Sequence, residues 1–219
     1  MSTPTAFVFT DFDDTMAKGD SILPYLTYCI RRKLAPRFQI LKAAVAFLRW
    51  KLNPDAATAS KETTLSFIAG RSVEEMDGIA RDFFREVHQR HFFQEGVAEL
   101  QQLRDKGVRI VVVSASADVY MRVLPEFLPC DEVLCTVCEV KDGVYTGKVG
   151  ENCKGEEKVR RIQAWLKEKD LCIDRGATSG YGDSPSDAPM LKMTGMPVLV
   201  NPKKKLRARV TGGRIVHWK

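Results

Sequence analysis

The stretch Ala6-Phe-Val-Phe-Thr-Asp-Phe-Asp-Asp-Thr15 decides the fold class and contains the first candidate site. Its mostly apolar first half ends in acidic residues, which predicts a short buried β-strand. Side chains two residues apart in an extended backbone point the same way, so Asp11 and Asp13 can share one site beyond the strand's carboxyl end. Open α/β sheets bind ligands at that edge. Two carboxylates there repel each other unless a cation or a shared proton relieves them. The alternative is a plain polar turn.

The remaining chain alternates strands with helices, apart from one long helical stretch. Val108–Ser114 is a nearly continuous apolar run, typical of a parallel strand covered on both faces. Further elements are expected as strands near 131–137, 177–181 and 197–200, helices over 97–106, 117–127 and 156–169, and a hairpin turn at Asp142-Gly143.

The pattern from Ser21 to about residue 92 is helical throughout, with a capping box at Ser72–Glu75. This stretch interrupts the sheet directly after its first strand. We therefore predict an α/β fold with a Rossmann-like parallel-sheet core and an inserted all-helical cap domain. The predicted core comprises residues 1–15 and 93–219, and the predicted cap comprises residues 16–92.

Polar side chains also follow other predicted strands. Ser114 ends the second strand with a hydroxyl that could hold a phosphate oxygen, although such a serine is more often a helix N-cap. Lys154 and Lys158 flank the start of the next helix, where they could reach an anion or remain solvated. Asp183 and Asp187 follow a later strand and could form an oxygen cage for Mg²⁺, or simply decorate a helix N-terminus. Together, at successive strand ends, these residues favour a phosphate site.

In this order and spacing, the motifs resemble the haloacid dehalogenase (HAD) superfamily of phosphohydrolases over nearly the whole chain. The matching features are Asp-x-Asp-x-Thr at 11–15, Ser114, a lysine at 154 or 158, and Gly-Asp-Ser-x-x-Asp at 182–187. A helical cap directly after the first motif is similar to the phosphoserine-phosphatase-like branch. The segments 152–161 and 197–207 also look typical of that branch.

The resemblance implies a role for each matching residue. Asp11 would be the nucleophile that forms an aspartyl-phosphate. Asp13 would protonate the leaving alkoxide and then take a proton from the attacking water. The implied binding residues are Asp11, the Asp13 carbonyl and Asp183 for Mg²⁺, Ser114 with Lys154 or Lys158 for the phosphate oxygens, and Asp187 as support for the metal or the lysine.

Two departures from the family pattern concern the substrate. Ala115 and Ser116 stand where phosphoserine phosphatases usually carry Gly-Gly after the serine, so a different pocket is expected. Asp20 stands where those enzymes carry an acid that faces the substrate's ammonium, which makes it a specificity candidate. Relatives that act on lipid phosphates can also carry an aspartate there, so Asp20 leaves the substrate open.

The net charge of +6 comes from two local segments. Residues 21–54 hold seven basic side chains and no acidic one, and residues 203–209 hold five more basic ones. A nucleic-acid binder would be basic more uniformly, so we expect no nucleic-acid partner. The run 203–209 is expected to be a solvated surface turn and helix with no catalytic role.

Two features predict a cytoplasmic protein. The first ten residues lack the charged and long apolar regions of a signal peptide. The apolar stretch Ile40–Trp50 is too short for a membrane span and carries two basic residues.

In that compartment the six cysteines should stay reduced. Cys135 and Cys138, with Cys130 and Cys153 nearby, could be drawn as a zinc site. The first two lie in a strand-like run and the second pair lacks zinc-like spacing, so we expect buried thiols instead.

Segment 31–52 shows two apolar faces and a narrow basic one. The faces are Phe38, Leu41, Val45, Leu48 and Leu52 on one side and Ile40, Ala43, Phe47 and Trp50 on the other. The favoured interpretation is a cap helix buried on both sides, whose basic stripe steers anionic phosphoesters into the cleft. The alternative is weak contact with a membrane surface through this segment.

We therefore expect a Mg²⁺-dependent phosphomonoester hydrolase that acts on a small phosphate ester, phosphoserine-like or similar, through an aspartyl-phosphate. One alternative is hydrolysis of a lysophospholipid or phosphatidylglycerophosphate at the membrane surface. Another is a non-catalytic phosphate-binding module. Transfer of the phosphoryl group to an acceptor other than water would use the same residues. The sequence gives no oligomeric state.

Overall fold

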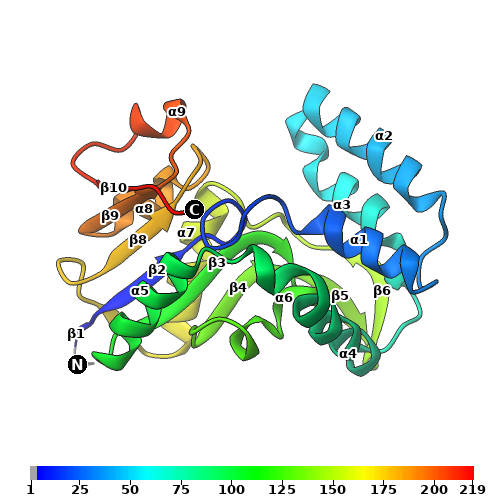
Figure 1. Ribbon diagram of the computed structural model, residues 1–219, viewed down its shortest axis with the longest axis horizontal. Helices are drawn as coiled ribbons and strands as arrows, with labels where there is room; N and C mark the ends of the chain where they lie inside the picture. The colour runs from blue at the N-terminus through cyan, green and yellow to red at the C-terminus, as the bar shows by residue number, and fades with distance from the viewer. Residues whose placement is uncertain (1–3) are drawn as a thin grey trace.

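The computed structural model describes residues 4–219, and its centre is a parallel sheet of six strands in the order β10-β9-β8-β2-β3-β4 (Figure 1). The strands are β2 (Phe7–Thr10), β3 (Arg109–Ala117), β4 (Glu132–Thr136), β8 (Ser179–Gly182), β9 (Met196–Val200) and β10 (Arg214–Val216). Two smaller pairs accompany them, β1 (Pro4–Thr5) with β7 (Cys172–Ile173), and β5 (Cys138–Lys141) with β6 (Val144–Val149). The predicted hairpin at Asp142-Gly143 connects the last pair.

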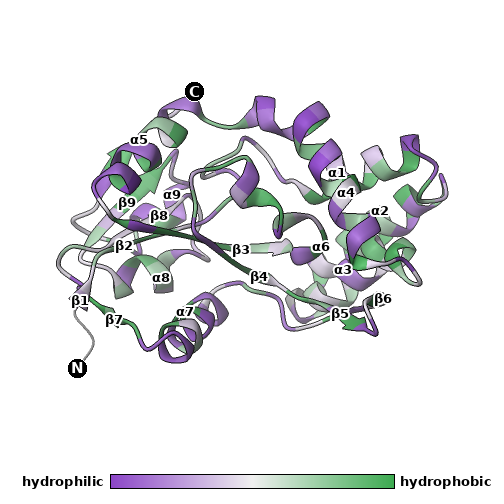
Figure 2. Ribbon diagram, turned by 90° about the horizontal axis from the view of Figure 1, so that it is seen from below, coloured by the Kyte–Doolittle hydropathy of each residue, from purple (hydrophilic) through white to green (hydrophobic). Residues whose placement is uncertain are grey.

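β2 lies in the middle of this sheet, between β8 and β3, and all four of its residues are buried. Its side chains alternate between two cores. Phe7 and Phe9 pack with Trp165 on the side of α7 (Glu156–Glu168), whereas Val8 belongs to the core on the side of α5 (Gln94–Asp105). Figure 2 shows hydrophobic residues in the central strands and hydrophilic ones on the outer turns of α5 and α7. α8 (Ala188–Met193) and the short α9 (Lys204–Arg207) complete the core region.

The chain leaves the sheet after β2 and returns through α5 and β3, with helices between. These are α1 (Ile22–Arg31), α2 (Gln39–Leu52), α3 (Ala57–Leu65) and α4 (Val73–Phe83), followed by a π-helical turn at Phe84–His88. The Ser72 side chain accepts the Glu75 N–H as the capping box predicts. The outgoing and returning connections lie side by side, with the Lys18 N–H donating to the His91 carbonyl at 2.9 Å. The proposed cap boundaries at 16 and 92 fall at this pairing.

The helical segment contacts a hairpin that the sequence patterns did not assign to it. Backbone N–H groups of Gly70 and Tyr145 donate to the carbonyls of Tyr145 and Arg71, both at 2.9 Å. The hairpin β5–β6 therefore extends the helical segment, although it follows β4 in the chain.

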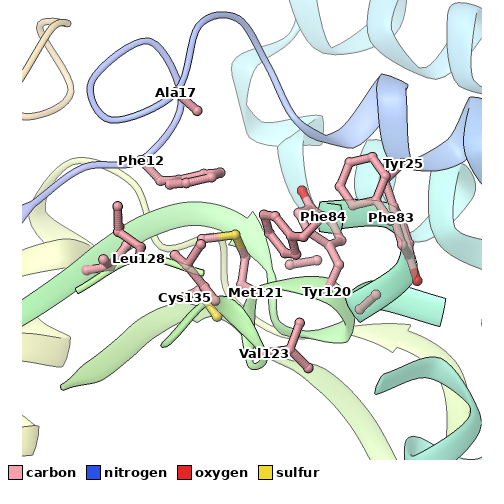
Figure 3. Packing of buried hydrophobic residues seen from close by; sticks show 14 of the residues in the cluster. Phe12, Ala17, Tyr25, Phe83, Phe84, Tyr120, Met121, Val123, Leu128 and Cys135 are labelled. Atoms are coloured by element: carbon pink, nitrogen blue, oxygen red, sulfur yellow. The ribbon is translucent and has the colours of Figure 1, made fainter. Parts of the chain in front are cut away.

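Aromatic side chains join the first-strand loop to the helical segment (Figure 3). Phe12 meets Phe84 edge-on, with ring centroids 6.3 Å apart. The ring centroids of Tyr25 on α1 and Tyr120 on α6 lie 4.6 Å apart. Such pairs add about 0.5–1.5 kcal/mol each beyond their buried area. Packing of Phe12 against Phe84 therefore fixes the loop after β2.

The helix predicted over 117–127 is shorter in the structure. α6 spans Asp118–Met121, and a separate 3₁₀ turn covers Leu124–Glu126. Pro125 lies in that turn, and because proline lacks an N–H it cannot continue an α-helical hydrogen-bond ladder.

The expectation that the helix in segment 31–52 is buried on both sides is wrong. Its buried residues are Gln39, Ala43 and Ala46, which lie toward α3. Both predicted apolar faces are largely exposed, at Phe38, Ile40, Leu41, Val45, Phe47, Leu48 and Leu52. Figure 1 shows the reason, because α2 lies at the outer edge of the helical segment and only one side of it has a neighbour.

All six cysteines are free, and every one except Cys172 is buried. Among residues 4–219, the acidic, cysteine and histidine side chains placed to hold a metal together are three aspartates, so no zinc site forms around Cys135. In the same part of the chain, no helix has the length and apolar character to cross a membrane.

We predict that His88 makes stability depend on pH. Its ring is 1% exposed, and neither nitrogen has a hydrogen-bond partner among the described residues. Burial lowers the pKa of His88 from 6.5 to about 4. Between these values the unfolded chain binds the proton and the folded one does not, so stability falls as the pH falls through this window. From pH 7 to pH 5 this one group should cost up to about 2 kcal/mol in the free energy of unfolding.

Urea unfolding at the two pH values measures this loss. His88→Leu should reduce the loss by that amount, because the remaining titratable groups are unchanged. His217→Leu, at an exposed position, should behave like the wild type. An equal loss in His88→Leu and the wild type would contradict the assignment.

Candidate active site

The candidate site lies where three neighbouring strands, β8, β2 and β3, reach their carboxyl ends. Asp11 follows β2, and its N–H donates to the Tyr181 carbonyl of β8 at 3.0 Å. Asp183 follows β8, and Asp187 begins α8. Carboxylate oxygens of Asp11, Asp183 and Asp187 lie within 4.8 Å of one another, and all three residues are buried. Parallel pairing thus joins residues that are about 170 positions apart in the chain.

One buried lysine compensates part of this negative charge. Lys158 Nζ, on the first turn of α7, donates to Asp11 Oδ1 and to Asp187 Oδ1, both at 2.7 Å. Lys158 is 1% exposed. Burial alone would lower its pKa, but the two aspartates raise it above the usual value, so the ammonium stays charged. Burial also raises the pKa of Asp11 to about 8, against the opposing charge of Lys158.

The Asp187 side chain is held in place by hydrogen bonds from Ser184. Its Oδ2 accepts the Ser184 N–H at 2.9 Å and the Ser184 hydroxyl at 2.8 Å, which leaves Oδ1 for Lys158. Asp187 therefore orients the lysine, one of the two supporting roles that the resemblance implied. The turn is tight, because a Cβ on Gly182 would lie 2.5 Å from the Asp187 Cβ.

Asp13 faces a different environment. Its Oδ1 accepts the Ser21 N–H at 3.0 Å, and its Oδ2 accepts the Ser116 hydroxyl. Burial, helped by the nearby charge of Asp20, raises the pKa of Asp13 to about 7, against the opposing effect of these hydrogen bonds. A carboxyl group with a pKa near neutrality suits proton transfer in both directions.

A cavity of about 350 Å³ opens beside Asp13. Asp20, Ser116 and Tyr120 line it on the polar side. Its other walls come from α1, α2, α3 and the loop before α7, through Ile22, Leu23, Ala43, Phe47, Trp50, Ala57, Ser60, Lys61, Thr64, Ala115, Asn152 and Lys154. The cavity is thus enclosed jointly by sheet loops and the helical segment.

The structure separates the two candidate lysines. Lys158 contacts Asp11, whereas Lys154 lies over the Trp50 ring with Nζ 5.0 Å from its centroid. Lys154 therefore lines the cavity wall and has no contact with the three aspartates. Ser114 is buried within β3, before that strand ends at Ala117, and its hydroxyl accepts the Ser116 N–H at 3.0 Å. Asp20 is exposed and accepts the Ile22 N–H at 2.9 Å, close to where α1 begins.

Sequence reasoning missed Lys61, which reaches from α3 into the same cavity. Lys61 Nζ donates to the Ala115 carbonyl of β3 and to Asn152 Oδ1 in the loop before α7. Lys61 therefore connects the helical segment to the sheet region. Burial lowers the pKa of Lys61 to about 8, against the charges of Asp20 and Asp13. A lone lysine in a polar helix gives no signal in the sequence, because its role depends on where the helix lies.

Lys203 departs from the expectation for the run 203–209. The helix α9 forms there as predicted, but Lys203 Nζ lies 2.5 Å from Asp183 Oδ2 and 3.3 Å from Asp14 Oδ2. Its backbone N–H also donates to the Asp183 carbonyl at 3.0 Å. One residue of this basic run therefore belongs to the candidate site.

The three aspartates fit a divalent cation. They offer oxygen ligands, which Mg²⁺ prefers, and only Lys158 and the half-exposed Lys203 neutralise them. Burial raises the pKa of Asp11 and of Asp183, so their charged forms are costly at this site. An additional cation between them would relieve this.

Buried carboxylates and a buried lysine at the strand ends of an α/β sheet form an arrangement suited to binding a cation and an anionic group. A sequence model of the haloacid dehalogenase-like hydrolase family matches residues 8–192. The chain therefore belongs to that family. The chain is 28% identical over 210 residues to a Mycobacterium tuberculosis protein named phosphoserine phosphatase SerB1, covering 93% of this chain and 67% of that one.

Two solved structures show the same fold. A protein of unknown function from Bordetella pertussis superposes with a TM-score of 0.85 and 23% identity, covering 98% of this chain and 99% of that one. A substrate-bound phosphoserine phosphatase gives a TM-score of 0.64 and 19% identity, covering 98% and 94%. The predicted family and the predicted α/β fold are thereby confirmed. The prediction of a phosphatase of the haloacid dehalogenase type is confirmed as well.

Gly182→Ala should damage the site through Asp187. The added Cβ would meet the Asp187 side chain at its root, where no flexible end can move away. We expect a loss of about 1–3 kcal/mol in unfolding free energy and weaker Mg²⁺ binding, measured by urea unfolding and calorimetry. Gly78→Ala in α4 meets open space and should be neutral or stabilising by up to about 1 kcal/mol. Unchanged Mg²⁺ affinity in Gly182→Ala would show that the turn does not position the ligands.

Proposed function

We propose that the chain is a Mg²⁺-dependent phosphomonoester hydrolase that works through an aspartyl-phosphate on Asp11. The observation that carries this proposal is the contrast between its two carboxyl groups. Asp11 is held by Lys158 among the buried aspartates, whereas Asp13 is turned toward the serines and the cavity. Neighbouring carboxyl groups in distinct environments are suited to distinct roles, here nucleophile and acid–base group.

In the first half-reaction, an Asp11 carboxylate oxygen attacks phosphorus and the bond from phosphorus to the leaving oxygen breaks. Asp13 donates its proton to that oxygen, so the product leaves as an alcohol into the adjacent cavity. Lys158 and Ser114 would hold the non-bridging oxygens, whose negative charge spreads in the transition state. The contact between Lys158 and Asp11 supports this role for the lysine.

In the second half-reaction, Asp13 takes a proton from water as that water attacks phosphorus. The Asp11–phosphorus bond breaks and inorganic phosphate forms. Asp11, the Asp13 carbonyl and Asp183 would hold Mg²⁺, whose positive charge would lessen the repulsion that a carboxylate nucleophile and a phosphate group exert on each other. Asp187 keeps Lys158 in position during both steps through its 2.7 Å hydrogen bond.

The cavity supports a small phosphate ester as the substrate. Its volume of about 350 Å³ suits a compact leaving group, and its wall presents both a negative and a positive charge, at Asp20 and Lys61. A zwitterionic leaving group such as serine would pair with both, and the relative named phosphoserine phosphatase SerB1 agrees with this choice.

A lipid phosphate is the second candidate substrate, favoured by the apolar wall formed by Leu23, Phe47 and Trp50. A phosphate-release panel that includes phosphoserine, phosphatidylglycerophosphate and p-nitrophenyl phosphate distinguishes the two. Faster release from phosphoserine would support a small zwitterionic substrate, and faster release from phosphatidylglycerophosphate would support a lipid phosphate. Absence of release from every ester with Mg²⁺ present would contradict the proposed hydrolase activity.

Asp11→Asn should abolish turnover and the trapping of a phospho-enzyme, because the amide is not a nucleophile. Circular dichroism should show an intact fold, since Asn can still accept from Lys158. Asp14→Asn in the same loop is the matched control and should keep most activity, because Asp14 contacts only Gly19 and Lys203 through its side chain. Activity of Asp11→Asn near the wild-type level would refute the nucleophile assignment.

With an alkyl phosphate ester as substrate, Asp13→Asn should slow both half-reactions by about 10²–10⁴-fold, the usual contribution of a positioned acid–base group. Rapid-quench measurements with p-nitrophenyl phosphate follow the two steps separately. This leaving group is a good one, so its departure should depend less on Asp13 than hydrolysis of the intermediate does. Dephosphorylation at the wild-type rate would exclude the second role of Asp13.

A further inference from the structure

The outer side of α2 carries an apolar stripe that no described residue covers. Leu41, Val45, Leu48 and Leu52 recur at intervals of four and three residues, and Phe38 continues the stripe at the helix start. Their exposed fractions are 68%, 52%, 59%, 80% and 55%, in the order Leu41, Val45, Leu48, Leu52 and Phe38. At 100° per residue they share one side of the helix, opposite the alanines that pack toward α3. We refer to these five residues as the α2 stripe.

Basic side chains border the α2 stripe on both flanks. Helical spacing places Lys42 and Arg49 on one flank and Lys51 on the other, and all three are exposed. The neighbouring turns add Arg31, Lys33 and Arg37, whereas Arg32 pairs with Glu86 and Asp82. Residues 21–54 contain no acidic residue. An exposed apolar face with a basic border is the surface expected of a helix that lies in a membrane interface.

The charge decides between the possible partners. A second copy of this chain, docked stripe to stripe, would bring two basic borders together without acidic residues of segment 21–54 to offset them. An anionic lipid surface instead attracts each basic side chain while its acyl region accepts the leucines. The observed combination therefore fits a lipid surface better than a self-associating one.

We propose that the α2 stripe docks the protein onto an anionic membrane surface. The leucines enter the headgroup–acyl boundary, and Lys42, Arg49 and Lys51 contact lipid phosphates. The docked helix also walls the cavity through Ala43, Phe47 and Trp50, so docking brings the cavity within one helix of the membrane. The basic helix α9 reaches the same upper edge of the molecule as α2 (Figure 1). Docking depends on the α2 stripe and not on which phosphate ester is cleaved.

Flotation of the full-length protein with vesicles tests this proposal. Vesicles of equal parts phosphatidylcholine and phosphatidylglycerol should carry the protein upward, and vesicles of phosphatidylcholine alone should carry much less. Leu41→Gln combined with Leu48→Gln and Leu52→Gln should lower partitioning by about tenfold or more. Lys42→Gln combined with Arg49→Gln should lower it by about tenfold, and added salt should weaken wild-type binding in the same direction.

Matched controls replace residues of the same kinds elsewhere. Val137→Gln with Ile215→Gln removes two half-exposed apolar side chains outside α2, and Lys106→Gln with Lys167→Gln removes two exposed lysines. Both controls should float like the wild type. The leucine variant should also keep its hydrolysis of soluble p-nitrophenyl phosphate, since none of its three positions lines the cavity. That readout shows that the variant is folded.

Three results would overturn the proposal. One is failure of the wild type to float with anionic vesicles. Another is equal loss of flotation in the control variants. The third is a dimer in sedimentation velocity that the leucine variant dissociates, without vesicle binding, which would assign the α2 stripe to a second copy of the chain. Loss of all phosphatase activity would bear on the proposed function alone, because flotation is measured without substrate.

Discussion

Burial of three carboxylates at one sheet edge is the constraint on which the rest of this structure depends. Asp11, Asp183 and Asp187 are each less than a tenth exposed, and like charges so placed are costly without compensation. Lys158 meets two of them and Lys203 the third. Positive charge from these two lysines stabilises the arrangement, and the same carboxylates could accept a further cation.

The sequence carries most of this site because parallel strands place their ends predictably. An apolar run followed by Asp11, and another followed by Asp183, predict neighbouring carboxylates once both runs are recognised as strands. The sequence alone does not show which of Lys154 and Lys158 lies at the site, since both flank the start of one helix. The choice depends on how α7 lies against β2, which turns Lys158 inward and leaves Lys154 against Trp50.

The helical segment was harder to interpret for a related reason. Periodicity shows that α2 has apolar faces, but not which neighbour covers them. α2 packs mainly against α3, and the small side chains of Ala43 and Ala46 allow the two helices to lie close together. Lys61 on α3 was unpredictable by the same logic, because a cation in a polar helix becomes part of a site only when the helix is placed over the Ala115 carbonyl.

A thin helical layer links the cavity to the outer surface. α2 is a single helix, about 10 Å across, with Phe47 and Trp50 on the cavity wall and the α2 stripe outside. Lys61 holds the neighbouring α3 to the sheet loops, while the connections at Lys18 and His91 pair at the segment's base. The α2 stripe and part of the cavity wall beside Asp13 therefore belong to one helix.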